Sequence, residues 1–503
     1  MKNKLYIYVA TALLFAVTVT SCEKIVEIDP QNSVTPAVAL KDVDGYQSVL
    51  ISVYDRLQTY GYYGRDMAIM GDALADNLFT ATAISGSRYN TQNLNSRGAH
   101  YNIWANAYGA INELNIIISG IDGLQDVPTS KAGLRVRVKA EALALRGMVY
   151  FDLARIYGYE PTKVPTTGTN ANFNKSAVLR LTPTTLAAEA ASKPRATILE
   201  VYASIEKDLL ASIAAFQSGP SVDAAFVIKS SNPYRVTESF THGLLGKVYL
   251  YWGGKDAAAV TEFDKALNPT ITTAVLSAAG NAAADFKKVP HPESLFELNY
   301  VQSVEVVGVT GSNDGLFTYT QPTGTNANNL ATFGGQTVSN ELVALLEPGD
   351  DRRALIFSAR TSTNAVVYNW ANKYPSSNGA YTDNVKIMRY ADVLLMKAEA
   401  LANQGFYPQA AALVVQLRTS RNATVVGVPV TAAIIDYIQD ERRRELFFEG
   451  HRWFDLKRLG KTITKPAQAT AAVPVVYTDY RILAPIPTGE ISLNPSLPQN
   501  PNY

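Results

Sequence analysis

The densest group of side chains with acid–base chemistry lies between Glu441 and Asp455. Glu441, Glu445 and Glu449 are spaced by four residues, so they would share one face of a continuous helix, and His451 follows closely. Two carboxylates beside an imidazole can donate and accept protons, and a carboxylate pair is the usual machinery of glycoside hydrolysis. The spacing therefore supports one hypothesis in which this segment is the active site of a glycosidase.

The same segment favours a second interpretation, in which its charges neutralise one another inside the fold. Glu441 and Arg444 are three residues apart, as are Arg452 and Asp455, so each couple can pair along a helix. The Phe and Trp residues between positions 447 and 454 would carry the segment into the core, where charges need partners. We expect this structural role, without catalysis. The predicted ion-pair network comprises Glu441, Arg442, Arg444, Glu445, Glu449, Arg452 and Asp455.

Other signatures of catalysis and of cofactor binding are absent from the sequence. It contains no Gly-x-Ser-x-Gly nucleophile motif, no glycine-rich phosphate loop and no His-Glu-x-x-His zinc motif. A single Cys excludes an internal disulfide, and the four His residues are far apart. The 45 Lys and Arg balance 44 Asp and Glu, which argues against nucleic acid as a partner. We expect no metal and no cofactor.

Helices must position these residues, because apolar side chains recur every three or four positions along much of the chain. The pattern predicts a helix over 139–157 and helical hairpins over 246–266 and 390–417, with Gly405 at a turn. Small residues at the crossings are typical of tetratricopeptide repeats, although ordinary antiparallel packing also uses them. Hairpins of this kind bury their apolar stripes by stacking. The predicted fold is mainly α, a tetratricopeptide-like superhelix of helix hairpins with loop-rich insertions and minor β.

The N-terminal segment has the pattern of a targeting signal. Lys2 and Lys4 precede an uncharged apolar run from Leu5 to Val19, which is too short for a membrane span and is typical of a secretory signal peptide. The run ends in Val-Thr-Ser-Cys22, which resembles a bacterial lipobox, and in such signals the Cys is acylated. The predicted regions are a signal peptide at 1–21, a lipidated tether at 22–36 and one helical domain at 37–503 with a loop-rich variable insertion at about 270–385.

Five segments resemble, in the same order, motifs of one protein family. They are the Trp-Tyr-Ile-Asn helix at 104–115, AEALALRGMVYFDLARIYGYEPTKVP at 140–165, RYADVLLMKAEALANQG at 389–405, ERRRELFFEGHRWFDLKRLG at 441–460, and the tail at 485–503. Together they are similar to the SusD/RagB family of nutrient-uptake lipoproteins of the Bacteroidota outer membrane. The resemblance covers almost the whole mature chain and is weakest over 163–188 and 270–380.

The resemblance implies a tetratricopeptide-containing α-helical domain, attached to the outer membrane through acylated Cys22 and exposed at the cell surface. It implies a non-catalytic protein that captures a nutrient, usually an oligosaccharide or polysaccharide, and delivers it to a SusC-like TonB-dependent transporter. It implies no particular ligand residues, because the binding loops of the family vary. Two alternatives stay open: a helical-repeat scaffold that binds peptides or proteins, and the glycosidase described above.

Ligand residues must be inferred from chemistry, since sugars stack on aromatic faces and bond to amides and guanidiniums. Trp104, Trp252 and Trp453 lie in helical motifs and are expected in the core, so the platform must use Tyr residues or Trp370. Two polar loops that contain aromatic residues, 87–93 and 313–329, are the candidates, with the Tyr-rich segment 60–63 as a third. The predicted ligand-binding residues are Arg88, Tyr89, Asn93, Phe317, Tyr319 and Asn326.

Overall fold

The fold is described by a computed structural model over residues 39–81, 88–219, 233–301, 314–322, 332–361, 364–469 and 471–503. The predicted signal peptide and tether, including Cys22, lie outside the described residues, as does Asn326. The proposed division of the chain at positions 21 and 36 therefore stays a prediction.

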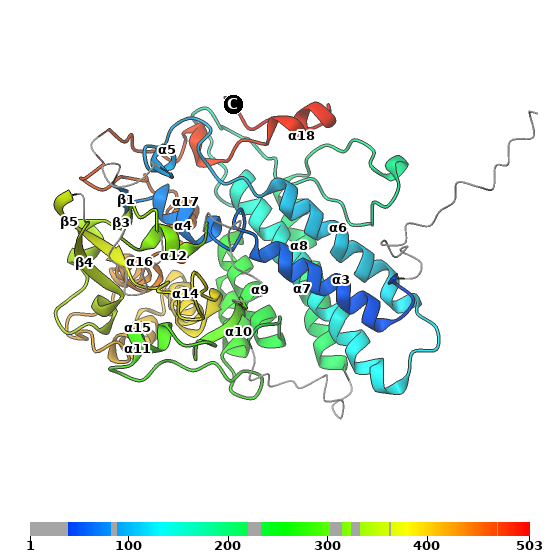
Figure 1. The fold of residues 1–503 in the computed structure, drawn as a ribbon, viewed down its shortest axis with the longest axis horizontal. Helices are drawn as coiled ribbons and strands as arrows, with labels where there is room; N and C mark the ends of the chain where they lie inside the picture. Colours follow the sequence, from blue (N-terminus) through cyan, green and yellow to red (C-terminus); the bar gives the residue numbers. More distant parts are fainter. Residues whose placement is uncertain are drawn as a thin grey trace, which may run out of the picture.

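Antiparallel helices stacked side by side form most of the structure, and the first four are on the right in Figure 1. Each helix packs against the next along the chain. The series contains α3 (Val43–Gln58), α6 (Trp104–Gly120), α7 (Thr129–Tyr157), α8 (Ile198–Ser218), α9 (Glu238–Trp252), α10 (Asp256–Ala266), α14 (Tyr390–Asn403), α15 (Tyr407–Thr419) and α16 (Ile434–Leu446). The predicted fold class is confirmed, and the two predicted hairpins are α9–α10 and α14–α15.

Small residues let the paired helices approach closely. A Cβ atom on Gly246 of α9 would lie 2.6 Å from the ring of Phe263 on α10, so nothing larger than hydrogen fits there without movement. Gly405 follows α14 with a φ of +83°, a left-handed conformation that favours glycine and turns the chain into α15. Ala398 and Ala410 are both fully buried in the apolar cluster of α14, α15 and α16.

Short strands and helices lie beside α14, α15 and α16 on the left side of Figure 1. The strands form three antiparallel pairs: β1 (Leu78–Thr80) with β3 (Gln336–Val338), β2 (Ser294–Leu298) with β6 (Val385–Arg389), and β4 (Ile356–Thr361) with β5 (Asn364–Ala371). The shorter helices are α4 (Asp66–Ala73), α5 (Asn90–Asn93), α11 (Ala282–Phe286), α12 (Leu316–Thr320), α13 (Asn340–Leu345), α17 (Arg452–Arg458) and α18 (Thr488–Leu493). Leu78 is opposite Val338, so β1 and β3 bring positions near 80 and 336 together.

Each helix in the described part of the chain is too short or too polar to cross a lipid bilayer.

Candidate functional site

The three glutamates spaced by four do not share one helix. α16 ends at Leu446, and Phe448 has a φ of +58°, so the chain turns before Glu449. α17 then begins at Arg452. The expectation of one continuous carboxylate face is therefore wrong for Glu449, although all three carboxylates point into the same buried region.

Glu441 lies at the centre of a buried cationic group. Its Oε1 accepts a hydrogen bond from Nη1 of Arg352 at 2.7 Å. Its Oε2 accepts from Nη1 of Arg418 at 2.6 Å and from Nη1 of Arg444, three residues further along α16, at 2.9 Å. No part of the Glu441 side chain reaches solvent. The sequence predicted the local pair with Arg444, while Arg352 and Arg418 come from distant parts of the chain.

Glu445 and Glu449 are paired in the same way. Glu445 accepts hydrogen bonds from three guanidiniums, those of Arg352, Arg389 and Arg421, at 2.9–3.2 Å. Glu449 accepts from Nε of Arg389 at 2.7 Å and from Nζ of Lys373 at 2.6 Å. Each of the three glutamates thus faces cations, and Glu449 also lines a small cavity.

The second half of the cluster is paired both across elements and along α17. Arg452 donates two hydrogen bonds, at 2.7 and 2.8 Å, to the carboxylate of Asp76. Asp455 accepts from Nε of Arg442 at 2.9 Å and from Arg458. The expected Arg452–Asp455 pair is replaced because Asp76 reaches Arg452 from the loop after α4.

These contacts are unsuited to glycoside hydrolysis. Burial alone would raise the pKa of Glu441, Glu445 and Glu449, but the surrounding guanidiniums outweigh burial and hold each pKa below its usual range. A glycosidase needs one carboxylic acid with a raised pKa to protonate the leaving group. Burial lowers the pKa of His451 to about 3, so its imidazole is neutral at pH 7.

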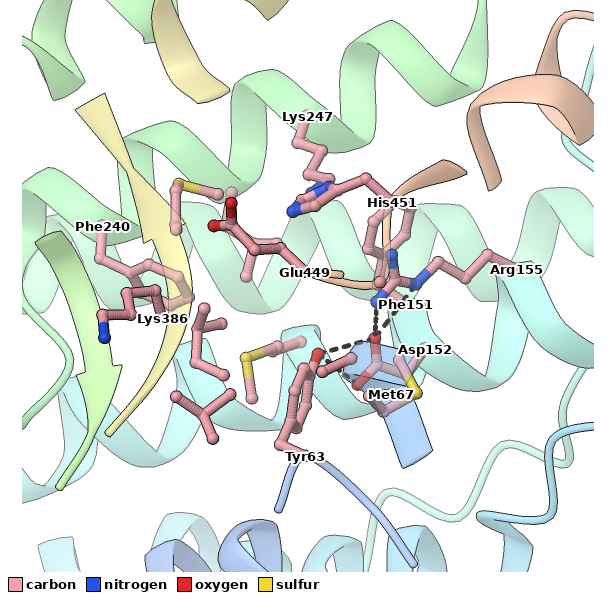
Figure 2. A pocket seen from close by; sticks show the side chains of 17 residues that line it. Tyr63, Met67, Phe151, Asp152, Arg155, Phe240, Lys247, Lys386, Glu449 and His451 are labelled. Carbon is pink, nitrogen blue, oxygen red and sulfur yellow. Dashed lines mark hydrogen bonds and ion pairs between the residues drawn. The ribbon is translucent and has the colours of Figure 1, made fainter. Parts of the chain in front are cut away.

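A cavity beside this network is lined by charged groups but is too small for a sugar. Its volume is about 40 Å³, whereas pockets for small molecules measure roughly 300–1,000 Å³. Figure 2 shows Tyr63 and Arg155 converging on Asp152 in its wall. Tyr63 Oη donates to Asp152 Oδ2 at 2.8 Å and Arg155 Nη2 to Oδ1 at 2.6 Å. The cavity has room for water molecules and belongs to the core.

A second candidate lies where the two predicted loops meet. We name it the aromatic–arginine site, and it comprises Tyr60, Arg65, Arg88, Asp314, Tyr319 and Phe333. The guanidinium of Arg65 lies 4.9 Å from the ring centre of Tyr60 and 5.3 Å from that of Tyr319. The guanidinium of Arg88 lies 5.1 Å from the ring centre of Tyr319 and 5.8 Å from that of Phe333. Aromatic rings and cations therefore alternate through this site, from buried Arg65 and Tyr319 to exposed Phe333.

Asp314 joins the two arginines. Its Oδ1 accepts hydrogen bonds from Nη1 of Arg88 at 2.6 Å and from the hydroxyl of Tyr319 at 2.5 Å. Its Oδ2 lies 3.2 Å from Nη1 of Arg65. Burial alone would raise the pKa of Asp314, but these partners outweigh it and lower the pKa, so the group is ionised at neutral pH.

Neighbouring elements hold this arrangement in place. Phe333 and Gly334 donate backbone hydrogen bonds to the carbonyl of Thr318 in α12, which fastens the ring of Phe333 beside Tyr319. Gln336, in β3, donates from Nε2 to the carbonyl of Arg88 at 2.7 Å. The β1–β3 pairing therefore keeps the Arg88 loop against α12.

Three side chains of the site reach solvent and can contact a ligand. Tyr60 is 45 % exposed and Phe333 is 41 % exposed. The side chain of Arg88 is 48 % exposed and lies beside Phe333. Flat aromatic faces next to a guanidinium–carboxylate pair provide stacking surface together with donors and acceptors for hydroxyl groups.

The structure places the predicted ligand residues at different depths. Arg88 is at the surface, and Tyr319 supports it from below, with 1 % exposure. Tyr89 is buried, and its hydroxyl donates to Asp66. The side chain of Asn93 bonds to the backbone of β1. Phe317 is buried against Tyr381.

Other residues of the site were missed or set aside by sequence reasoning. Tyr60 belongs to the Tyr-rich third candidate, whose other tyrosines, Tyr62 and Tyr63, are buried and donate to Asp152. Trp370, expected as a possible platform, is fully buried. Asp314 lies within the candidate loop 313–329 but was not singled out, because its two arginine partners are far away in sequence. Phe333 lies outside both candidate loops.

A third concavity, of about 290 Å³, lies between α6 and α18. Trp104 and Tyr108 form part of its wall and Leu493, 82 % exposed, is on its rim. Its asparagine Asn112 is already bonded in both directions to the backbone of Thr184. The groove offers apolar surface, but its asparagine side chains already form hydrogen bonds within the protein.

Two family models match separate regions of the chain. The family model described as "Starch-binding associating with outer membrane" matches residues 41–250, and the model described as "SusD family" matches residues 357–503. The chain belongs to the SusD/RagB family. SusD-like protein P38 of Formosa agariphila is 24 % identical over 543 residues, which cover 96 % of this chain and 96 % of that protein.

Solved structures of the SusD superfamily share this fold. One from Bacteroides thetaiotaomicron matches with a TM-score of 0.77 and 24 % identity over 92 % of this chain and 100 % of that one. A structure named as a laminarin-binding SusD-like protein matches with a TM-score of 0.68 and 22 % identity, covering 92 % of this chain and 100 % of that one. Within this SusD/RagB chain, Arg65 and Arg88 lie in the first matched region, whereas Asp314, Tyr319 and Phe333 lie between the two.

Proposed function

We propose that this SusD/RagB protein is a non-catalytic binding protein that captures an oligosaccharide or polysaccharide at the aromatic–arginine site. The observation that carries the proposal is the surface of exposed Tyr60 and Phe333 around the paired side chains of Arg88 and Asp314. Aromatic rings stack on the C–H faces of sugars, and the charged pair bonds their hydroxyl groups. The names of the starch-binding family model and the laminarin-binding relative support carbohydrate as the ligand class.

The charges of the Glu441 cluster support a role without catalysis. Its carboxylates are buried, paired with guanidiniums, and ionised. A binding protein of this kind leaves the glycan intact. The matching test is an assay for new reducing ends after incubation with laminarin or starch, and the proposal predicts no increase over a blank.

The proposed location is the outer membrane, with the chain anchored through acylated Cys22 and exposed at the cell surface. Two acyl chains make a stable anchor, whereas one alone binds reversibly. A Cys22→Ala variant is expected to leave the membrane fraction after washing with high salt. A variant that stays bound would contradict the anchor.

The proposed partner is a SusC-like TonB-dependent transporter, to which the captured glycan is delivered. Co-purification of the transporter with the wild-type lipoprotein from detergent-solubilised outer membranes is the expected result. Co-purification combined with no glycan binding at all would favour the alternative of a scaffold for peptides or proteins.

Affinity electrophoresis in gels that contain laminarin or starch tests the binding site itself. The Tyr60→Ala/Phe333→Ala variant is expected to lose most of the retardation, because each aromatic contact contributes roughly 0.5–1.5 kcal/mol. Its melting temperature should be nearly unchanged, since both residues are at the surface. Leu493→Ser, at an exposed apolar residue on the α6–α18 groove, is the matched control and should migrate like the wild type. Retardation that follows Leu493 instead would move the site to that groove.

A further inference from the structure

The two guanidiniums of the aromatic–arginine site are matched by two carboxylates. Nε of Arg65 donates to Oδ1 of Asp66 at 2.8 Å, and Nη1 lies 3.2 Å from Oδ2 of Asp314. Nη1 of Arg88 is 2.6 Å from Oδ1 of Asp314. The formal charge of this group is therefore zero, and both arginines are engaged before any ligand arrives.

We infer that the aromatic–arginine site selects neutral glycans and rejects glycans that carry sulfate or carboxylate groups. The inference rests on the proposed carbohydrate-binding function and narrows its substrate class. An anionic group that took the place of Asp314 as the ion-pair partner of Arg88 would have to displace that carboxylate, whose side chain is only 18 % exposed. Asp314 would then lose its shortest ion pair while staying largely buried, which is unfavourable. If Asp314 stayed in place, the incoming anion would meet a like charge.

A hydroxyl group meets no such obstacle. A guanidinium has five N–H donors, and among the described residues the guanidinium of Arg88 has one hydrogen-bond acceptor, Asp314. The remaining N–H donors can bond to a neutral hydroxyl group without breaking the ion pair between Arg88 and Asp314. A carboxylate also accepts several hydrogen bonds, so Asp314 can receive a sugar hydroxyl in addition. The rings of Tyr60 and Phe333 provide stacking surface that requires no ligand charge.

Affinity electrophoresis with one polymer in two charge states tests the inference on the full-length mature protein. The probes are laminarin, chemically sulfated laminarin and alginate, each in low salt. We expect laminarin to retard the protein. The apparent dissociation constant for the sulfated polymer and for alginate should be at least tenfold higher than that for laminarin. Equal or stronger retardation by either polyanion would overturn the inference while leaving carbohydrate binding intact. Absence of retardation by every polysaccharide would overturn the proposed function and the inference together.

An Asp314→Asn variant tests the reason for the selectivity. It removes one negative charge and leaves Arg88 without its ion-pair partner, while Arg65 keeps Asp66. The variant should therefore gain retardation by sulfated laminarin at least threefold over the wild type. This gain should disappear in 0.5 M NaCl, because salt screens exposed charges. A folded variant, with an unchanged circular-dichroism spectrum, that gained nothing would overturn the role of Asp314. If the variant does not fold, the comparison of the three polymers on the wild type still decides the inference.

Discussion

Arg88 and Asp314 are 226 positions apart in sequence, and their side chains form an ion pair with an Nη1–Oδ1 distance of 2.6 Å. This contact joins a loop that enters α5 to the start of α12, and it brings the two predicted binding loops together. The same carboxylate reaches Arg65 and Tyr319, so one aspartate orders most of the polar groups of the aromatic–arginine site. Binding at this surface should therefore depend on Tyr319 as well, which is buried and holds Asp314 through its hydroxyl.

Replacing Tyr319 by Phe should weaken glycan binding without unfolding the protein. The change removes the hydroxyl that donates to Asp314 but keeps the ring that supports Arg88. We expect the dissociation constant for laminarin to rise roughly three- to tenfold, which corresponds to about 0.7–1.4 kcal/mol of binding free energy. Isothermal titration calorimetry measures this constant. Tyr319→Ala is a poorer test, because this buried ring would leave a cavity. Unchanged affinity in Tyr319→Phe would mean that the position of Asp314 does not matter.

Replacing Glu445 by Gln should cost the protein much of its stability. Glu445 is buried and faces Arg352, Arg389 and Arg421, so the neutral amide leaves buried positive charge without compensation. The free energy of unfolding, from urea titration, should fall by about 3–5 kcal/mol. The control is Asp436→Asn, which breaks an exposed ion pair with Lys461. This variant should change the free energy of unfolding by less than about 1 kcal/mol. A stable Glu445→Gln protein that had lost an enzymatic activity would instead revive the hypothesis of an active site.

Stability should fall as pH rises above neutrality because of His242. This buried imidazole lies 2.5 Å from Glu262 and 3.6 Å from Glu238, near Lys265. Burial alone would lower its pKa, but the hydrogen bonds to the two glutamates outweigh burial and raise the pKa above the usual value of about 6.5. The stabilisation is therefore complete below about pH 6.5 and is lost as the pH rises through the raised pKa.

Thermal melts between pH 6 and pH 9 check this sign. Over that range the melting temperature of the wild type should fall further than that of the His242→Asn variant, whose amide does not titrate. Parallel curves for the two proteins would mean that protonated His242 adds no stability.

Gly246 should be intolerant of a methyl group. An added Cβ would lie 2.6 Å from the ring of Phe263, so Gly246→Ala forces α9 and α10 apart and should lower the free energy of unfolding by about 1–3 kcal/mol. Gly109 in α6 is the matched control, because there the Cβ meets only the end of the Arg56 side chain, which can move. Gly109→Ala should be neutral or stabilising by up to about 1 kcal/mol. Equal effects at both sites would refute close helix packing at Gly246.

Local periodicity was enough to predict the helices, but not the partners of charged residues. The spacing in 390–417 and 246–266 predicts two hairpins because helix pairing between neighbours depends on adjacent sequence. The pair of Glu441 with Arg444 follows from the same local rule. By contrast, Arg452 pairs with Asp76, which is 376 positions away, and no spacing rule reaches that far.

Burial separates the predicted ligand residues into exposed and covered ones. Polar loops with aromatic residues pointed to Arg88 and Tyr319, which the structure brings into contact, yet sequence cannot tell which face of a loop is covered. Tyr89 and Phe317 are inside, while Phe333 is exposed. The exposed ring of Phe333 depends on the backbone bonds to Thr318, which only the fold reveals.

A crystal structure of the protein soaked with a laminarin oligosaccharide would show the occupied site. We expect an uncleaved chain of sugars stacked on Tyr60 and Phe333, with hydroxyl groups bonded to Arg88 and Asp314 while their ion pair stays closed. A sugar bound instead in the groove between α6 and α18, or cleaved next to the Glu441 cluster, would contradict this expectation.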